Sequence, residues 1–393
     1  MRITVYGGSF DPPHIGHVSA AKAAAQASCG RFLIIPDCEA PHKEMDEAGA
    51  SPEDRLQLCR LAFSDVPNAE ISDMEIRRGG KSYTSDTLHA ILSDNPGAEL
   101  SLVVGTDMLM SFDSWYDAGW LMKNVRLLAV ARDRGEREAM EGKASELREK
   151  FGAEVLLVDA EPVPVSSSAV REMLRHRQGC ELLTPETYAY IIKRRLYGAK
   201  PSFEWLRERA KEMLKPKRVP HVLGCEQEAR HLALRWGESE EDAAEAAILH
   251  DITKKLELTE QLLLCGKYGI IPDAVEEKSQ KLLHAKTGAA VARYEFGVSD
   301  RVYEAIRWHT TGKSGMTMLE QIMYMADYIE PTRDFDGVEE LRRLAYTDMD
   351  EAMLLGLKMS LEEIIARGEY PHSDSRAAAE YFEKRVESKK TTA

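Results

Sequence analysis

Two histidines stand close together near the start of the chain, in the string Y-G-G-S-F-D-P-P-H-I-G-H over residues 6–17. His14 and His17 are three positions apart, so both imidazole rings can face one phosphate-sized pocket. Gly7 and Gly8 allow backbone amides to approach a phosphate without an intervening Cβ. The alanine-rich stretch that follows would start a helix, and a helix N-terminus favours anions. The string therefore predicts a nucleotide-phosphate site.

Histidines and aspartates that could bind metal recur in the second half of the chain. Imidazole and carboxylate groups are ligands for iron, manganese or zinc, and six of them could hold two ions with positions left for water and phosphate. A single histidine in a helical protein is more often a packed or surface residue. The adjacent histidine and aspartate within the apolar run 246–252 favour a metal site. The candidate ligands are His221, His250, Asp251, His284, His309 and Asp327.

Short apolar runs alternate with helical segments in the first half, which predicts a parallel sheet covered on both faces. Ligands of such sheets lie beyond the carboxyl ends of the strands, so the polar loops that follow the strands should meet in one crevice. The predicted strands cover residues 3–6, 32–36, 100–104, 125–131 and 155–158.

The periodicity changes after a breaker-rich joint at residues 198–202. From residue 203 onward, helical patterns follow one another with almost no alternation of the strand type, which predicts an all-helical bundle. The sequence thus predicts an α/β domain over 1–197, a linker over 198–202 and an all-α domain over 203–393. Residues 389–393 are expected to form a loose tail.

The first half resembles the bacterial nicotinate-mononucleotide adenylyltransferases of the nucleotidyltransferase superfamily, which implies a Rossmann-like fold. The hallmark is H-I-G-H at residues 14–17. The other matching strings are P-D-C-E-A-P-H-K at 36–43, S-Y-T-S-D-T-L at 82–88, G-T-D at 105–107 with W-Y at 115–116, and S-S-S-A-V-R at 166–171.

This resemblance implies adenylyl transfer from ATP to nicotinate mononucleotide, giving deamido-NAD and pyrophosphate, with Mg²⁺ accompanying ATP. His14, His17, Lys43 and Arg171 are the implied catalytic residues. The implied ATP contacts are Gly7, Gly8, Ser9, Phe10, His14, His17, Gly105, Asp107, Arg132, Ser167, Ser168 and Arg171. The implied nicotinate contacts are Lys43, Thr84, Trp115 and Tyr116. From physics alone, nicotinamide mononucleotide or another phosphate-bearing acceptor remains an alternative.

The second half resembles the HD-domain phosphohydrolases, and most closely the branch that cleaves diadenosine tetraphosphate symmetrically into two ADP. The matching strings are H-D-I-T-K-K at 250–255, A-I-R-W-H-T-T-G at 305–312 and A-D-Y-I-E-P-T-R at 326–333. The resemblance implies that the six candidate ligands hold two divalent cations, with iron favoured and manganese or zinc as alternatives. It also implies that Asp251 is catalytic and that Lys254, Thr287 and Arg333 hold the nucleotide. Lys286 departs from the pattern.

Composition excludes several other classes of protein. A formal net charge of −14 argues against a general nucleic-acid binder. We see neither a signal peptide nor a membrane span, so we expect a cytoplasmic protein with reduced cysteines and no membrane partner. A homodimer remains open. The alternative for the second half is a non-catalytic module that senses nucleotides, or a hydrolase of another phosphate ester in place of a dinucleoside polyphosphate.

Overall fold

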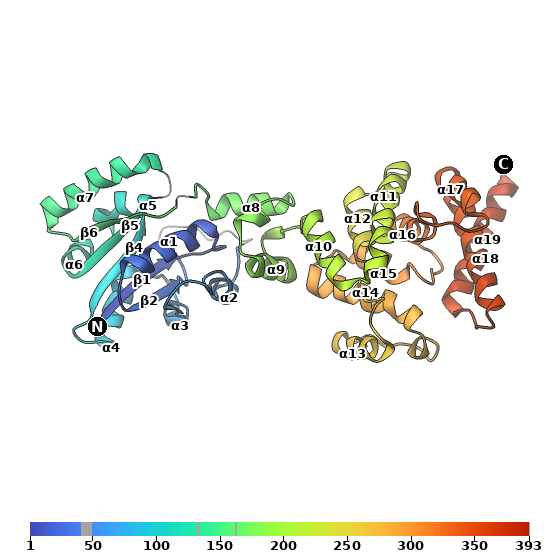
Figure 1. The fold of residues 1–393 in the computed structure, drawn as a ribbon, viewed down its shortest axis with the longest axis horizontal. Coiled ribbons are helices and arrows are strands. Elements are labelled where there is room, and N and C mark those ends of the chain that lie inside the picture. The colour runs from blue at the N-terminus through green and yellow to red at the C-terminus, as the bar shows by residue number, and fades with distance from the viewer. Residues whose placement is uncertain (41–48, 132–133, 162, 393) are drawn as a thin grey trace. The chain divides into compact units, whose positions relative to one another are not determined.

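The computed structural model describes residues 1–40, 49–131, 134–161 and 163–392. The chain divides into two compact units, Met1–Lys200 and Pro201–Ala393. Figure 1 colours the first unit from blue to green and the second from green to red. Each unit is described by itself below.

A six-stranded parallel sheet forms the centre of the first unit, with the strand order β3-β2-β1-β4-β5-β6. The strands are β1 (Arg2–Gly8), β2 (Arg31–Pro36), β3 (Ala69–Ile71), β4 (Glu99–Gly105), β5 (Val125–Val130) and β6 (Val155–Val158). Val5 of β1 pairs with Leu33 of β2 on one side and with Leu102 of β4 on the other. The strand order reverses at β1, and ligands of open parallel sheets bind at such a reversal point.

Both faces of the sheet are buried under helices, which explains why its strands read as continuous apolar runs. Alternate residues of each strand face opposite sides, so Val5 enters one core and Tyr6 enters the other. The helices are α1 (Ile15–Ala27), α2 (Pro52–Ala62), α3 (Met74–Arg78), α4 (Thr84–Asp94), α5 (Thr106–Met110), α6 (Ala118–Asn124), α7 (Arg137–Phe151), α8 (Ser167–Arg175) and α9 (Pro185–Arg194). Short 3₁₀ turns are η1 (Phe112–Ser114), η2 (Arg134–Glu136), η3 (Cys180–Leu182) and η4 (Leu196–Gly198).

The described part of the second unit contains helices and turns and no strand, as the periodicity predicts (Figure 1). Its helices are α10 (Phe203–Met213), α11 (Val219–Trp236), α12 (Glu240–Leu249), α13 (Leu258–Tyr268), α14 (Gln280–Phe296), α15 (Asp300–Trp308), α16 (Met318–Ile329), α17 (Val338–Thr347), α18 (Met349–Ala366) and α19 (Ser373–Thr392). The 3₁₀ turns are η5 (Pro216–Arg218) and η6 (Glu276–Lys278). Apolar residues of α11, α12, α14, α15 and α16 form one continuous core.

The expected loose tail is wrong for residues 389–392, because α19 runs to Thr392. The ammonium of Lys389 lies 2.8 Å from an oxygen of Asp348 and 2.8 Å from an oxygen of Asp350. These ion pairs hold the polar end of the helix against the start of α18, which sequence polarity did not reveal. Within the described residues, every helix is too short or too polar to cross a membrane.

Candidate phosphate site and candidate metal centre

The turn between β1 and α1 brings the two histidines of the first unit together. The ring centroids of His14 and His17 lie 3.8 Å apart. The backbone amide of His14 donates to Nδ1 of His17 at 3.2 Å, so each histidine caps the first turn of α1. His14 is only 5% exposed. The sequence spacing therefore places both imidazole groups at a helix N-terminus, where an anion is favoured.

Packing around Gly16, between the two histidines, is tight. A Cβ at Gly16 would lie 3.1 Å from both Cε1 and Nδ1 of His14, and 3.4 Å from the carbonyl of Val163. A larger residue would fit there only if the His14 ring shifted. The residue type at this position is therefore tied to the placement of the His14 ring.

A buried arginine holds the loop after β1 against the end of β2. The guanidinium of Arg55 is fully buried and donates to the carbonyl of Ser9 at 2.8 Å and to Oδ1 of Asp37 at 2.9 Å. The hydroxyl of Ser9 donates to the other oxygen of Asp37 at 2.7 Å. Phe10 packs edge-on against His17, with ring centroids 5.3 Å apart. Asp37 lies in the matching string at 36–43, but neither Asp37 nor Arg55 was selected as a site residue, because their contacts form only once the loops are folded together.

The serine-rich segment reaches the same turn from α8. The hydroxyl of Ser167 donates to the carbonyl of Pro12 at 2.9 Å, and Arg171 donates to the carbonyl of Asp11 at 2.8 Å. Arg171 also lies 3.4 Å from the hydroxyl of Ser168. These contacts bring three residues that were predicted to bind the triphosphate to the turn that carries the histidines.

The residues predicted to bind the acceptor also lie near one another. Thr84 is the first residue of helix α4, and Tyr83 just before it contacts Tyr116, with ring centroids 4.9 Å apart. Trp115 follows η1 and packs on Phe112, with ring centroids 4.9 Å apart, so part of its ring is used by the core.

Other predicted residues of the first unit follow strands or lie outside the described residues. Gly7 and Gly8 end β1, while Gly105 ends β4 and Asp107 lies in the first turn of α5. Since β1 and β4 are parallel neighbours, these ends meet at the same edge of the sheet. Lys43 and Arg132 lie outside the described residues.

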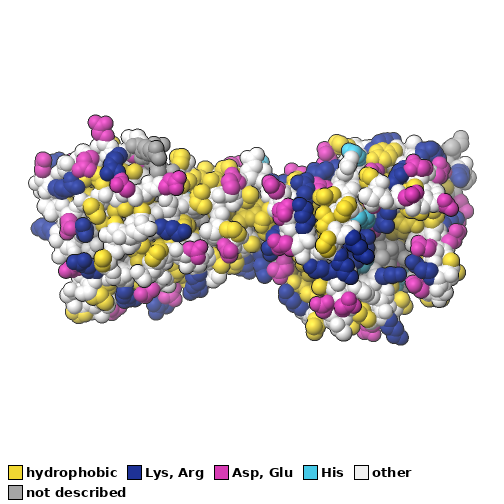
Figure 2. All heavy atoms as spheres, in the orientation of Figure 1, with side chains coloured by type: hydrophobic (Ala, Val, Ile, Leu, Met, Phe, Trp, Pro, Cys, Tyr) yellow, Lys and Arg dark blue, Asp and Glu magenta, His cyan; other side chains and the backbone are white. Residues whose placement is uncertain are grey.

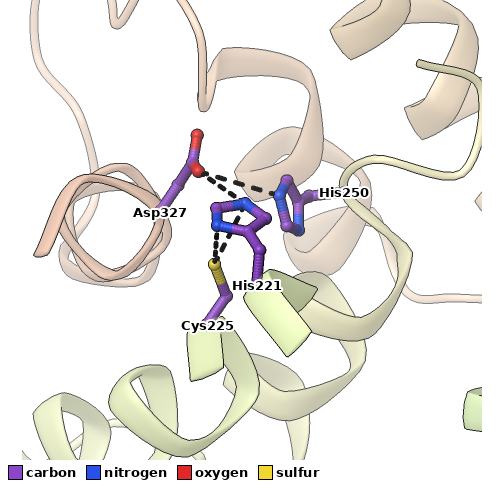
Figure 3. A group of neighbouring side chains, drawn as sticks. All are labelled: His221, Cys225, His250 and Asp327. Atoms are coloured by element: carbon purple, nitrogen blue, oxygen red, sulfur yellow. Dashed lines mark hydrogen bonds and ion pairs between the residues drawn. The ribbon is translucent and has the colours of Figure 1, made fainter. Parts of the chain in front are cut away.

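Five helices or helix ends supply the predicted metal ligands of the second unit. Their side chains converge in one buried group, part of which Figure 3 shows. His221 lies on α11, His250 and Asp251 follow α12, His284 lies on α14, His309 ends α15 and Asp327 lies on α16. Gly288 permits this convergence, because a Cβ there would lie 3.1 Å from the carbonyl of His250.

Ring nitrogens of the histidines approach the two aspartates and one another. Nε2 of His221 lies 3.0 Å from Asp327, and Nε2 of His250 lies 3.5 Å from Asp251. Nε2 of His284 lies 3.2 Å from Asp251. The shortest contact between rings joins Nε2 of His284 to Nε2 of His309 at 3.1 Å.

A repeated local contact aims three of these rings. In each case Nδ1 donates to the backbone carbonyl three residues earlier, which leaves a lone pair on Nε2 of the neutral ring. The contacts are His250 to Ala247 at 2.6 Å, His284 to Lys281 at 2.7 Å and His309 to Ile306 at 2.6 Å. Nδ1 of His221 instead donates to Glu330 at 3.0 Å.

The electrostatics of the group favour a bound cation. Burial, together with the neighbouring His284 and His250, lowers the pKa of His309 to about 3, and burial also lowers the pKa of His284. Both rings are therefore neutral near pH 7, and their Nε2 lone pairs face each other. Burial lowers the pKa of His250, but Asp251 and Asp327 outweigh it and the net pKa is raised. The buried Nε2 of His250 has no hydrogen-bond partner among the described residues, and the Asp251 carboxylate lies 3.5 Å from it. The residues present therefore fit divalent cations that accept nitrogen and carboxylate ligands.

Three cationic side chains surround the two aspartates. Arg218 and Lys254 both pair with Asp251, the latter at 3.0 Å, and Arg333 pairs with Asp327 at 2.8 Å. Burial raises the pKa of Asp251, but His250, His284 and Lys254 outweigh it, so the net pKa is well below the usual range. Figure 2 shows lysine and arginine side chains gathered near histidine atoms on the visible face of this unit.

Thr287 stands apart from the other predicted nucleotide contacts. It is fully buried, and its hydroxyl donates to the carbonyl of Leu283 at 3.0 Å and lies 2.9 Å from the hydroxyl of Thr253. These contacts pack α14 against the turn after α12. A contact between Thr287 and a nucleotide stays a prediction.

Three further residues belong to this centre: Arg218 and Cys225, which lie outside the matching strings, and Glu330, which lies in the string at 326–333 but was not selected as a site residue. Cys225 lies one helical turn after His221, with Sγ 3.5 Å from Nε2 of that ring (Figure 3). The pKa of the Cys225 thiol is raised by burial and by nearby carboxylates including Asp327. The i, i+4 spacing of His221 and Cys225 on a helix is the signal that could have found the cysteine.

Two family profiles match the chain, one in each unit. The cytidylyltransferase-like family matches residues 5–173, and the HD domain matches residues 218–332. A probable nicotinate-nucleotide adenylyltransferase of Carboxydothermus hydrogenoformans is 32% identical over 198 residues, which are 50% of this chain and 98% of that protein. The first half of this chain belongs to the nicotinate-nucleotide adenylyltransferase family. The second half contains an HD domain.

Other relatives agree with this assignment. Probable nicotinate-nucleotide adenylyltransferases of Gloeobacter violaceus and Gemmatimonas aurantiaca are 36% and 34% identical, and the matches span 96% and 94% of their lengths. They cover 50% and 51% of this chain. The adenylyltransferase-family unit thus corresponds to nearly the full length of these proteins, and the HD domain is additional to them.

Two solved structures are each similar to about half of the chain. A crystal structure of a predicted HD superfamily hydrolase involved in NAD metabolism from Clostridium acetobutylicum is 33% identical, covers 48% of this chain and 100% of its own, and has a TM-score of 0.46. The nicotinic acid mononucleotide adenylyltransferase of Plasmodium falciparum is 19% identical, covers 51% of this chain and 98% of its own, and has a TM-score of 0.42.

Proposed function

We propose that the chain is a bifunctional enzyme, with an adenylyltransferase over residues 1–197 and a metal-dependent phosphohydrolase over 203–393. The first activity would join ATP and nicotinate mononucleotide to give deamido-NAD and pyrophosphate. Its main support is the family membership, since relatives named for this activity match over nearly their whole length. The paired rings of His14 and His17 at the start of α1 supply the matching chemistry.

Adenylyl transfer needs no covalent intermediate on the protein. A phosphate oxygen of nicotinate mononucleotide forms a bond to the α-phosphorus of ATP, and the bond from that phosphorus to the departing pyrophosphate breaks. We assign His14 and His17 to donating hydrogen bonds to phosphate oxygens as negative charge redistributes. Arg171 and the start of α8 would hold the triphosphate, and Lys43 would add a further positive charge. Mg²⁺ bound with ATP would offset the charge of the leaving pyrophosphate.

The acceptor is assigned to nicotinate mononucleotide through Thr84, Trp115 and Tyr116. An aromatic ring such as Trp115 can stack on a flat pyridine ring, and hydroxyl or backbone groups near Thr84 can hold its carboxylate. The neighbouring contact of Tyr83 with Tyr116 supports a common location for the three residues. Nicotinamide mononucleotide would lack the carboxylate that this assignment requires.

For the HD domain we propose hydrolysis of a dinucleoside polyphosphate, with diadenosine tetraphosphate giving two ADP and consuming one water. The supporting observation is the group of four histidines and two aspartates. In this group Nε2 of His284 faces Nε2 of His309, and Nε2 of His250 has no hydrogen-bond donor among the described residues. Two divalent cations held there, iron in preference to manganese or zinc, would lower the pKa of water and offset phosphate charge. Lys254 and Arg333 lie beside the aspartates, where they could bind phosphate oxygens.

The transferase proposal is tested with purified full-length protein, ATP and nicotinate mononucleotide, by measuring deamido-NAD and pyrophosphate. We expect His17→Ala to abolish transfer while the fold is retained. His89→Ala is a matched control. His89 packs on Trp120, with ring centroids 3.8 Å apart, and lies outside residues 9–17, which we call the phosphate turn. Product formation only with nicotinamide mononucleotide or phosphopantetheine would contradict the acceptor assignment.

The hydrolase proposal is tested by elemental analysis followed by a panel of nucleotide substrates. We expect bound transition metal, ADP from diadenosine tetraphosphate, and loss of both in His250→Ala. His231→Ala is the control, because His231 is exposed on α11. No bound metal and no ADP would favour the non-catalytic nucleotide-sensing module, and release of phosphate from another ester would change the substrate.

A further inference from the structure

A tyrosine at the end of the adenylyltransferase-family unit contacts the phosphate turn at its beginning. The hydroxyl of Tyr197, in η4, donates to Oδ1 of Asp11 at 2.7 Å. The backbone amide of Ala50 donates to the same oxygen at 3.1 Å. Asp11 lies three residues before His14 in the same turn. One carboxylate therefore joins the last segment of this unit to the loop that carries the histidines.

The backbone at this tyrosine has an uncommon conformation. Tyr197 has φ +62° and ψ +9°, and Arg195 two residues earlier has φ +55°. A positive φ is rare for a bulky residue other than glycine, and it persists where surrounding contacts over-determine it. The carbonyl of Tyr197 accepts from Nε of Arg175 at 3.1 Å, and the residue is only 3% exposed. These contacts fix the position of the Tyr197 hydroxyl.

The contacts of the turn divide into two kinds. Ser167 and Arg171 hold the backbone carbonyls of Pro12 and Asp11. The carboxylate of Asp11 is oriented by Tyr197 and Ala50 at hydrogen-bond distance, whereas the guanidinium of Arg171 is 3.9 Å away. Burial and the adjacent carboxylate raise the pKa of Tyr197, so its hydroxyl stays protonated and donates.

We propose that Tyr197 is a positioning residue for adenylyl transfer, which acts through Asp11 to fix the turn carrying His14 and His17. The inference rests on the proposed transferase function. It means that the segment leading out of this unit toward the HD domain is part of the machinery that shapes the phosphate site. Misplaced imidazole groups would stabilise the transition state less while substrate binding changed little, so the loss would fall on kcat rather than on KM.

The test is Tyr197→Phe in the full-length protein, which removes the hydroxyl and keeps the ring. We expect kcat for deamido-NAD formation to fall by at least about tenfold, with a smaller change in KM for ATP. Tyr190→Phe is the matched control, because its hydroxyl also donates to a carboxylate at 2.7 Å, that of Asp54, outside the phosphate turn. We expect this control to keep kcat within about twofold, because the partners of Asp54 are Ser51, Tyr190 and Arg194, which lie outside residues 9–17.

A second variant, Asp11→Ala, keeps the inference testable if the first variant fails to fold. If Tyr197 acts through Asp11, the double variant should be no slower than Asp11→Ala alone. A wild-type kcat in Tyr197→Phe, or in Asp11→Ala if only that variant folds, would overturn the inference. Lower thermal stability of Tyr197→Phe with unchanged kcat would also overturn the inference, because the tyrosine would then contribute only to stability. Absence of transfer by the wild-type protein would instead refute the proposed transferase function.

Discussion

Glu330 orients the first histidine of the candidate metal centre, although the sequence did not single it out within the string at 326–333. Its carboxylate accepts from Nδ1 of His221 at 3.0 Å, and it lies against Gly224 on α11. A Cβ at Gly224 would be 2.5 Å from Oε2 of Glu330. The glycine therefore leaves room for the carboxylate that aims the ring.

We expect Gly224→Ala to weaken metal binding by about 10- to 100-fold, the usual effect of disturbing a group that orients a ligand. The new methyl group would push the Glu330 carboxylate away from His221. Affinity can be measured by competition with a coloured chelator. Gly266→Ala on α13 is the matched control, because nothing lies within 4 Å of the Cβ it would add. Equal metal affinity in the two variants would contradict the role of Glu330.

At the residue scale, chemical type made the candidate metal ligands visible in the sequence, whereas the residues that orient them were not selected. Histidine and aspartate stand out even when they are far apart. Glu330 lies in the matching string at 326–333, but it is 109 residues from His221, so the sequence does not reveal its contact with that ring. Lys286 departed from the family pattern. Its ammonium pairs with the buried Glu276 at 2.5 Å, so the structure gives Lys286 a role in packing α14 against η6.

Helices α2 and α9 are joined by a buried carboxylate. Asp54 accepts from the hydroxyl of Tyr190 at 2.7 Å and from Arg194 at 3.2 Å. Burial raises the pKa of Asp54, but the hydrogen bonds from Tyr190, Arg194 and Ser51 outweigh it, and the net pKa is lowered. Because the folded-state pKa lies below the unfolded one, the ionised carboxylate stabilises the fold above the unfolded pKa. This stabilisation is lost as the pH falls through the folded value.

We expect Asp54→Asn to reduce the free energy of unfolding by about 1 kcal/mol at pH 7, the typical net value of such a hydrogen bond. The difference from wild type should shrink from about pH 4 downward, where the unfolded carboxylate binds a proton. Chemical denaturation at several pH values measures this difference in the free energy of unfolding. The exposed Asp65, changed to Asn, serves as the control. If the difference in the free energy of unfolding stayed constant down to pH 2, the ionised Asp54 carboxylate would not be the source of the stabilisation.

At the scale of elements, apolar runs and breakers predicted the long strands and the helical second half. The sequence missed β3, which is three residues long and contains no apolar run. This strand depends on a neighbour distant in the sequence. β3 exists because it pairs with β2.

The two units have separate hydrophobic cores, so each should respond to its own ligand. We expect calorimetry of the whole protein to show two unfolding transitions. A ligand that binds only the folded state raises the stability of the domain that holds it. ATP with nicotinate mononucleotide should therefore raise one melting temperature, and removal of metal by a chelator should lower the other. A single transition moved by both treatments would contradict independent unfolding.

When a cell runs short of transition metal, His284 and His309 keep two ring lone pairs facing each other at 3.1 Å. Without a cation between them, this repulsion weakens the packing of α14 against the end of α15. Local opening then becomes easier, and proteases cut segments that open. Both units are parts of one polypeptide, so its turnover would remove them together. We therefore expect the cellular lifetime of the adenylyltransferase-family unit to depend on the supply of a metal bound elsewhere in the chain.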